Sequence, residues 1–273
     1  HGWSNLQSAH LNLPFAGDKE FGCLHAAVRI VLPLLPALAA ASPIVNGRQT
    51  GLLDNRIEAY RLNQARIPSI TGSVIPEPVY TRKAYQREIL EKLYRDISSH
   101  DPDKVLCHEW LNSRGAIARF DRNTIEIRLL DVQESPHADL AIIALVVEVL
   151  RELVAETHAR LAEQQNWPET TLAEIFNRVL REGRGAVISD PKYLALFGLH
   201  GDALSVGDVW LSLMERLIPA GSDAWEPLLT IVNEGPLARR ILTALGDNMG
   251  QEQLARVYRQ LCECLQEGRL FHG

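Results

Sequence analysis

The stretch from Trp110 to Asp139, WLNSRGAIARFDRNTIEIRLLDVQESPHAD, determines how the rest of the chain is interpreted. Residues 124–131 alternate apolar and polar side chains, which is the pattern of a half-buried strand. Residues 116–120 form a shorter run of the same kind, and the polar residues 121–123 between the two runs are typical of a hairpin turn. The sequence therefore predicts an antiparallel pair of strands joined by a tight turn.

Two charged side chains on the longer run are the first candidates for a functional site. Glu126 and Arg128 are two residues apart, so on a strand they project from the same face. A carboxylate suits a metal ion, and a guanidinium group can bind two phosphoryl oxygens at once. Arg119, on the shorter run, is expected beside them. The alternative interpretation is a ladder of exposed ion pairs, which are common on strand surfaces.

The remaining elements follow from hydrophobic spacing and breaker residues. Residues 6–15 predict another strand, on which His10 and Asn12 share a face. Residues 18–40 predict an apolar helix kinked by its prolines, and the loop at 42–51 contains Arg48, with Arg56 following it. Residues 67–78 are expected to be irregular. Helices are predicted at 81–97, 138–164, 171–182, 206–218, 224–233, 236–245 and 251–266.

The fold class is therefore α+β, with an all-helical C-terminal half. Residues 1–150 are expected to belong to a mixed domain, and residues 151–273 to a helical region packed on it. With 273 residues, the chain can bury a large core without disulfide bonds.

Charge and composition limit the classes of partner and compartment. The formal net charge of −6 argues against a general nucleic-acid binder, which is normally basic. The apolar run at residues 24–45 contains Arg29 and two prolines, so we interpret it as a buried helix and not as a membrane span. The four cysteines show no disulfide or zinc pattern, which favours a reducing cytoplasm.

Three segments together resemble glutamate–cysteine ligase family 2, the carboxylate–amine ligases with a glutamine-synthetase-like fold. They are QSAHLNLPF at residues 7–15, LPLLPALAAASPIVNGRQTG at residues 32–51, and residues 112–139 with their Glu-Ile-Arg-x-x-Asp core at residues 126–131. The resemblance implies part of the family's antiparallel sheet surrounded by many helices. It covers about the first half of the chain.

The resemblance also implies an ATP- and Mg²⁺-dependent reaction, in which a carboxylate is phosphorylated and an amine then displaces phosphate. The carboxylate would be the γ-carboxylate of glutamate. Matched by position, metal binding is implied for Glu126 and His10, catalysis for Arg128 and Arg119, and substrate binding for Arg48 and Arg56. Contacts to the nucleotide are implied for Arg128, Asn12 and Arg114.

One departure from the family pattern limits these expectations. Family members have further N-terminal strands that supply additional metal-binding glutamates, and no such segment precedes His10 here. We therefore expect this chain alone to be a poor catalyst, completed by an N-terminal segment or by a second chain. The alternatives are a non-catalytic helical binding module with a relic nucleotide pocket and a helical scaffold without a small-molecule site. A homo-oligomer is equally compatible with the long helices.

Overall fold

The computed structural model describes residues 7–273, so Leu6, the first residue of the predicted N-terminal strand, lies outside this range. The central sheet is antiparallel and contains β1 (Ser8–Pro14), β5 (Thr124–Asp131) and β4 (Ala116–Arg119), in the order β1-β5-β4. Residues 124–131, the longer run of the stretch from Trp110 to Asp139, thus form the middle strand. Both strands of the predicted hairpin and the N-terminal strand are confirmed.

The pairing of β1 with β5 contains an irregularity next to the candidate site residues. Ala9 pairs with Leu130 and Leu11 with Ile127, so one residue of β1, His10, faces two residues of β5. Such bulges bend a strand and redirect its side chains. On the other side of β5, Gly115 precedes β4, and an added Cβ there would lie 2.7 Å from the Leu129 side chain. Only glycine allows this close approach.

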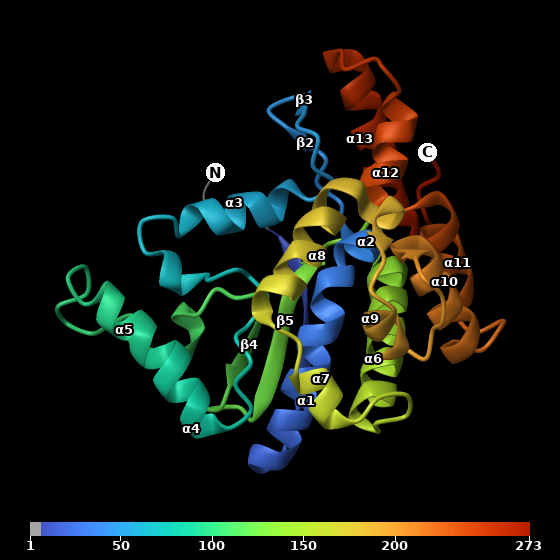
Figure 1. Cartoon of the computed structure of the whole chain (residues 1–273). Helices are drawn as coiled ribbons and strands as arrows, with labels where there is room; N and C mark the ends of the chain where they lie inside the picture. The colour runs from blue at the N-terminus through green and yellow to red at the C-terminus, as the bar shows by residue number, and fades with distance from the viewer. Residues whose placement is uncertain (1–6) are drawn as a thin grey trace.

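The apolar helix that follows β1 lies at the centre of the molecule (Figure 1). It runs as α1 (Gly17–Val31), then a short 3-10 segment, η2 (Leu32–Leu34), and then α2 (Pro36–Ala39). Pro33 and Pro36 cannot donate the backbone hydrogen bonds of a continuous helix, so they explain the predicted break. This segment contacts β5, α6 (Pro136–Val154) and α8 (Glu169–Glu182).

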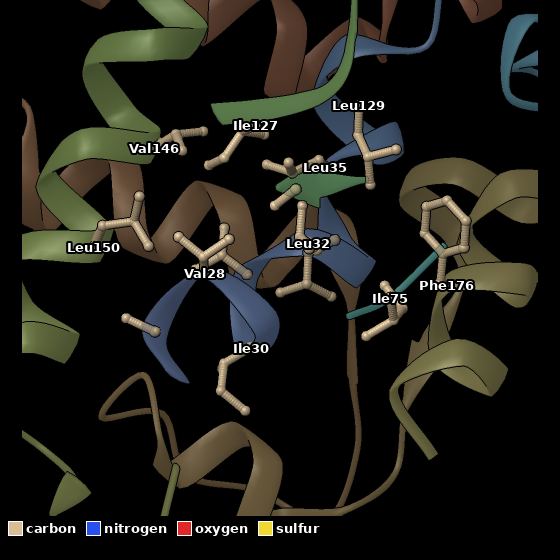
Figure 2. Close-up of a cluster of buried hydrophobic side chains, with 14 of the residues drawn as sticks. Val28, Ile30, Leu32, Leu35, Ile75, Ile127, Leu129, Val146, Leu150 and Phe176 are labelled. Atoms are coloured by element: carbon tan, nitrogen blue, oxygen red, sulfur yellow. The ribbon is translucent and has the colours of Figure 1, made fainter. Parts of the chain in front are cut away.

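The main core forms where these elements meet. Figure 2 shows Val28, Leu32 and Leu35 from the central segment beside Ile127 and Leu129 of β5. All five of these side chains are fully buried. Burying one such side chain contributes about 2 kcal/mol. The same core contains side chains from both sides of residue 150, and the division into two domains remains a prediction.

Side-chain caps determine where several helices begin. Asp54 accepts a hydrogen bond from the Ile57 amide at 2.8 Å and starts α3 (Asn55–Asn63). Thr81 does the same for α4 (Arg82–Tyr85), which continues through a π-helical segment, η4 (Gln86–Leu90), into α5 (Glu91–Ile97). Ser135 caps α6, and Pro136 occupies its first turn, where a missing amide costs nothing.

The C-terminal half departs from the all-helical prediction at two points. The helix predicted at 138–164 ends at Val154, because Glu156 adopts a positive φ of 55°, and a separate helix, α7 (Leu161–Gln165), follows. A two-residue ladder joins β6 (Val187–Ile188) to β7 (Leu204–Ser205), with α9 (Pro191–Ala195) between them. The other helices match the prediction within three residues: α8, α10 (Val206–Leu217), α11 (Trp225–Glu234), α12 (Leu237–Leu245) and α13 (Gln251–Glu267).

The predicted loop at 42–51 and the irregular segment at 67–78 both contain short elements. The loop forms a small hairpin of β2 (Ile44–Val45) and β3 (Arg48–Gln49), and the segment begins with a 3-10 turn, η3 (Pro68–Ile70). Another 3-10 turn, η5 (Glu109–Leu111), leads into β4.

A buried ion pair ties the last part of the chain to the segment after β5. Glu134 binds the guanidinium of Arg240 on α12, and both side chains are at most 1% exposed. The Glu134 carboxylate also accepts a hydrogen bond from the Phe271 amide at 3.1 Å, and Arg240 donates to the Phe271 carbonyl. Within residues 7–273, no helix combines the length and the apolar character needed to cross a membrane.

Candidate functional site

A cavity of about 390 Å³ opens between the N-terminal strand, α3 and the lead into β4. Its polar wall includes His10, Arg56 and Arg128, which come from three elements far apart in sequence. The full lining is Ser8, His10, Arg56, Tyr60, Gln64, Trp110, Leu111, Ser113 and Arg128. The cavity is therefore formed around the strand pair that the sequence places at the centre.

Glu126 lies directly behind this wall and binds two of its members. One carboxylate oxygen, Oε1, is 2.7 Å from Arg128 Nε and 3.0 Å from His10 Nδ1, and the other is 3.6 Å from Arg119 Nη1. The hydrogen bond from His10 and the positive charge of Arg128 lower the pKa of Glu126 to about 2. The carboxylate is only 7% exposed, so this is a half-enclosed charge cluster and not an exposed ion-pair ladder.

His10 uses both ring nitrogens. Nδ1 lies against Glu126, and Nε2 lies 2.8 Å from the Ser8 hydroxyl. A neutral imidazole protonated at Nδ1 satisfies both contacts, because it donates to Glu126 and accepts from Ser8. The bulge in β1–β5 pairing brings His10 opposite Arg128 and Leu129, which explains how an edge strand reaches the site.

Arg56 is fixed by the end of β5. Its Nε donates to the Asp131 carboxylate, and its Nη1 donates to the Arg128 carbonyl at 3.3 Å. Asp131 is itself held by the Ala41 amide at 2.7 Å and the Ser42 hydroxyl at 2.9 Å. The residues just after α2 thus orient the carboxylate that orients the arginine.

A second buried carboxyl group lies beside this arrangement. Asp54 has no exposed surface, and the Ser42 hydroxyl lies 3.4 Å from its Oδ1. Burial, and then repulsion from Asp131, raise the pKa of Asp54 to about 7. Its Oδ2 atom has no hydrogen-bond partner among residues 7–273, which suits a protonated carboxyl group better than a carboxylate.

The structure brings together only part of the predicted site. His10, Arg56 and Arg128 line the cavity, with Glu126 and Arg119 bound behind them. Arg119 is also paired with Asp121 through two contacts of 3.1 and 3.2 Å. The roles implied for these residues remain predictions.

Three predicted residues lie outside the cavity wall. Arg48 is exposed on β3, and Asn12 is exposed on β1 opposite Glu126. Arg114 is 1% exposed and forms two contacts of 2.5 Å with Glu77, plus one of 2.9 Å with Asn112. Its guanidinium is fully engaged in holding the chain together, so a nucleotide would have to displace those contacts to reach it.

The sequence interpretation missed the residues that complete the wall. Tyr60 and Gln64 follow Arg56 at intervals of four, so all three project from one side of α3 and its last turn. That spacing is the signal that could have identified them. Trp110 and Ser113 come from the lead into β4, which has no regular pattern to read.

The side chains at the cavity can be compared with the ligands that Mg²⁺ and a nucleotide require. Residues 7–273 include no group of three or more His, Cys, Asp or Glu residues placed to hold a metal ion. Mg²⁺, however, is usually held by one or two carboxylates together with water and substrate phosphates. Glu126, with His10 beside it, fits a magnesium ion that arrives with a nucleotide, and Arg56 and Arg128 fit the phosphates.

Comparisons with known proteins identify a family and two relatives. The model of glutamate–cysteine ligase family 2 matches residues 1–260. An Archaeoglobus fulgidus protein of unassigned function is 31% identical over 275 residues, covering 99% of this chain and 66% of its own length. A Nocardioides protein with the provisional name glutamate–cysteine ligase 2-1 is 28% identical over 182 residues, covering 67% of this chain and 44% of its own length.

This chain therefore spans about two thirds of the archaeal relative and less than half of the Nocardioides relative. The family match extends well past the central strands into the helical half, further than the resemblance that the motifs alone carry. The chain belongs to glutamate–cysteine ligase family 2.

Proposed function

We propose that this chain forms the phosphate- and substrate-binding part of an ATP-dependent carboxylate–amine ligase of the glutamate–cysteine ligase type. One observation carries the proposal: His10 and Arg128 line a single cavity with Arg56 and both bind the Glu126 carboxylate. A non-catalytic module would not need these side chains to converge. Their convergence supports the ligase over that alternative.

In the proposed reaction, an oxygen of the substrate carboxylate attacks the γ-phosphorus of ATP, forming an acyl phosphate and releasing ADP. The amine nitrogen then attacks the acyl carbon, phosphate leaves, and the nitrogen loses a proton. Arg56 and Arg128 would donate hydrogen bonds to phosphoryl oxygens, where negative charge accumulates. Bound Mg²⁺ would supply further charge neutralisation, with Glu126 as its carboxylate ligand.

The substrates and partners in this proposal follow the family. The carboxylate would be the γ-carboxylate of glutamate, and the amine that of a second amino acid. Glu126 is the one carboxylate that this proposal assigns to the metal, and it lies behind the cavity wall, so we propose that an additional segment or a second chain supplies the other metal ligands. All four cysteines are free, which supports a cytoplasmic location.

The test is thermal unfolding with ADP alone and with ADP plus Mg²⁺, on the parent and on Glu126→Gln. A ligand that binds only the folded state stabilises it by about 2.7 kcal/mol at a concentration of 100 Kd. We expect ADP to raise the melting temperature of both proteins and Mg²⁺ to add a further rise only in the parent. The substitution removes the charged metal ligand and keeps Arg128 in the cavity wall.

The matched control is Arg151→Ala, since Arg151 is an exposed arginine on α6 whose side chain is 70% accessible. It should behave as the parent does in every condition. An equal Mg²⁺ increment in Glu126→Gln would remove Glu126 from the metal site, and the absence of any ADP effect in the parent would contradict the nucleotide site.

A further inference from the structure

The Ser8 hydroxyl lies at the cavity and has no role in the proposed ligase reaction. Ser8 is the first residue of β1, it is half-buried, and it lines the cavity together with His10. The two residues are two positions apart on one strand, so their side chains project from the same face. A serine hydroxyl becomes a good nucleophile only when a neighbouring base takes its proton. The atoms around Ser8 therefore determine what it can do.

His10 is placed to act as that base. Its Nε2 atom lies 2.8 Å from Ser8 Oγ, and its Nδ1 atom lies 3.0 Å from Oε1 of Glu126. In serine hydrolases, Nε2 of a histidine faces the nucleophilic hydroxyl and Nδ1 faces a carboxylate, both at hydrogen-bond length. The order of hydroxyl, imidazole and carboxylate is thus the same here, atom by atom. The His10 side chain is 42% exposed, so a substrate can reach the hydroxyl beside it.

Glu126 is fixed in the position that this arrangement needs. It belongs to the middle strand of the sheet and is 7% exposed. Its Oε1 atom also accepts a hydrogen bond from Arg128 Nε at 2.7 Å, and its other oxygen lies 3.6 Å from Arg119 Nη1. A carboxylate held from both sides keeps the imidazole in one orientation and stabilises the imidazolium that forms when the base accepts a proton. This support distinguishes the arrangement from an ordinary contact between a serine and a histidine on a strand surface.

Positive charge lies on the wall of the same cavity. Arg56 and Arg128 line it together with Ser8. The Nη2 group of Arg56 is buried and has no hydrogen-bond partner within residues 7–273. Guanidinium groups beside a nucleophile can bind the negative oxygen of a tetrahedral intermediate or an anionic group of the substrate. The cavity therefore favours acyl compounds that carry a negative charge.

We propose that Ser8, His10 and Glu126 form a catalytic triad that hydrolyses esters whose acyl group carries an ionised carboxylate. Ser8 Oγ attacks the ester carbonyl carbon, its proton passes to His10 Nε2, and the leaving group departs with that proton. A water molecule then gives a proton to His10 and attacks the acyl-serine. The acid is released, and His10 returns the proton to Ser8 Oγ.

This activity goes beyond the proposed ligase function, because it consumes no ATP and needs no metal ion. The first test is covalent labelling with a fluorophosphonate, located by peptide mass spectrometry. An activated serine oxygen displaces fluoride from the phosphorus, so the adduct marks the nucleophile. The assays contain EDTA, so that Glu126 and His10 are not occupied by a metal ion. We expect the label on Ser8 of the parent.

Three variants test the members of the triad separately. Ser8→Ala should lose the adduct, and both His10→Ala and Glu126→Gln should label at least about tenfold more slowly, because the hydroxyl is no longer activated. Thermal unfolding of each variant checks that the fold is kept. Ser99→Ala, at an exposed serine in the turn after α5, is the matched control and should label as the parent does.

Two esters test the class of substrate. Mono-p-nitrophenyl adipate and p-nitrophenyl hexanoate have acyl chains of equal length, which end in a carboxylate and in a methyl group. We expect kcat/KM to be about tenfold or more higher for the adipate ester, because charge-assisted hydrogen bonds hold its carboxylate. Arg56→Gln should remove most of this preference. Ser8→Ala should lower kcat/KM for the adipate ester by about 100-fold or more.

Ester hydrolysis that is unchanged in Ser8→Ala, or an adduct on another residue with Ser8 unmodified, would overturn the inference. Equal rates for the two esters would overturn the substrate class. These outcomes are separate from the failure of the proposed function, because the assays contain no nucleotide. Ser8-dependent hydrolysis by a protein that binds no ADP would contradict the ligase and leave the triad intact. Ligase turnover in a parent protein that forms no Ser8 adduct would do the reverse.

Discussion

At the residue scale, Asp54 gives the clearest dependence on pH. Its folded pKa of about 7 lies above the value near 4 expected in the unfolded chain. Between these two values the folded state retains a proton that the unfolded state has released, so stability falls as the pH rises through this window. The full shift corresponds to about 4 kcal/mol at most.

Asp54→Asn should abolish that loss. The amide oxygen can still cap α3 by accepting from the Ile57 amide, and it has no proton to release. We expect urea unfolding of the parent to give a lower free energy at pH 7.5 than at pH 5, and the difference to shrink in Asp54→Asn. Asp96→Asn, at an exposed carboxylate on α5, should keep the parent's difference. Identical pH slopes in Asp54→Asn and the parent would contradict the assignment.

The residues differ in how far the sequence could predict them. Glu126 and Arg128 could be placed together because alternation along one strand is a local property, and their carboxylate and guanidinium bond at 2.7 Å. The setting of Arg114 could not be predicted, because its partner Glu77 lies 37 residues upstream on another segment. Asp54 was missed because only the tertiary fold places it beside Asp131.

At the element scale, the segment at 67–78 depends on Arg114. The guanidinium binds both oxygens of Glu77 at 2.5 Å and donates to the Ser69 carbonyl at 3.2 Å. Gly72, with a φ of +59°, passes so close that an added Cβ would lie 3.2 Å from this guanidinium. Ser69, Gly72 and Glu77 of this segment therefore all lie against one side chain.

Arg114→Met should detach this segment while preserving most of the buried volume. Breaking a buried ion pair by removing one partner costs about 3–5 kcal/mol, and the 22% exposure of Glu77 places the expected loss at or below the lower end. Guanidinium unfolding measures the loss, and hydrogen exchange should show faster exchange at 67–78. Arg87→Met, in an exposed pair with Glu88, should be nearly neutral. Unchanged protection at 67–78 would contradict this role.

The elements themselves were predicted where the signal is local. Alternation identified β1, β4 and β5, and the prolines identified the break after Val31. The end of α6 at Val154 was missed, because residues 155–164 still have helix-forming composition and only the backbone at Glu156 reverses. The two-residue ladder between β6 and β7 is too short to produce any periodic pattern.

At the scale of the whole molecule, the buried pair of Glu134 and Arg240 joins the C-terminal helices to the segment after the sheet. Glu134→Gln would leave the Arg240 charge buried without its counter-charge, so we expect a loss of about 3–5 kcal/mol in chemical unfolding. The pair of substitutions Glu134→Leu and Arg240→Met should recover part of it, because no isolated charge remains. Glu148→Gln, in an exposed pair with Arg151, serves as the control.

A double substitution no more stable than Glu134→Gln alone would mean that the hydrogen bonds to Phe271 matter more than the charge. The class of fold could be predicted at this scale, because the three strands of the central sheet all lie before residue 132 and helical spacing dominates after it. How the helices pack on one another could not be, since the same apolar faces allow several arrangements.

The sheet has one further consequence for the chain in solution. Within residues 7–273, β1 pairs with β5 along one side only, which leaves the backbone groups of its other side without a strand partner. Apolar residues alternate along β1 at Ala9, Leu11 and Leu13, and Pro14 interrupts the hydrogen-bonding edge at one end. Such an edge can pair with a strand of another molecule, so the exposed side of β1 favours self-association of the chain until another strand covers it.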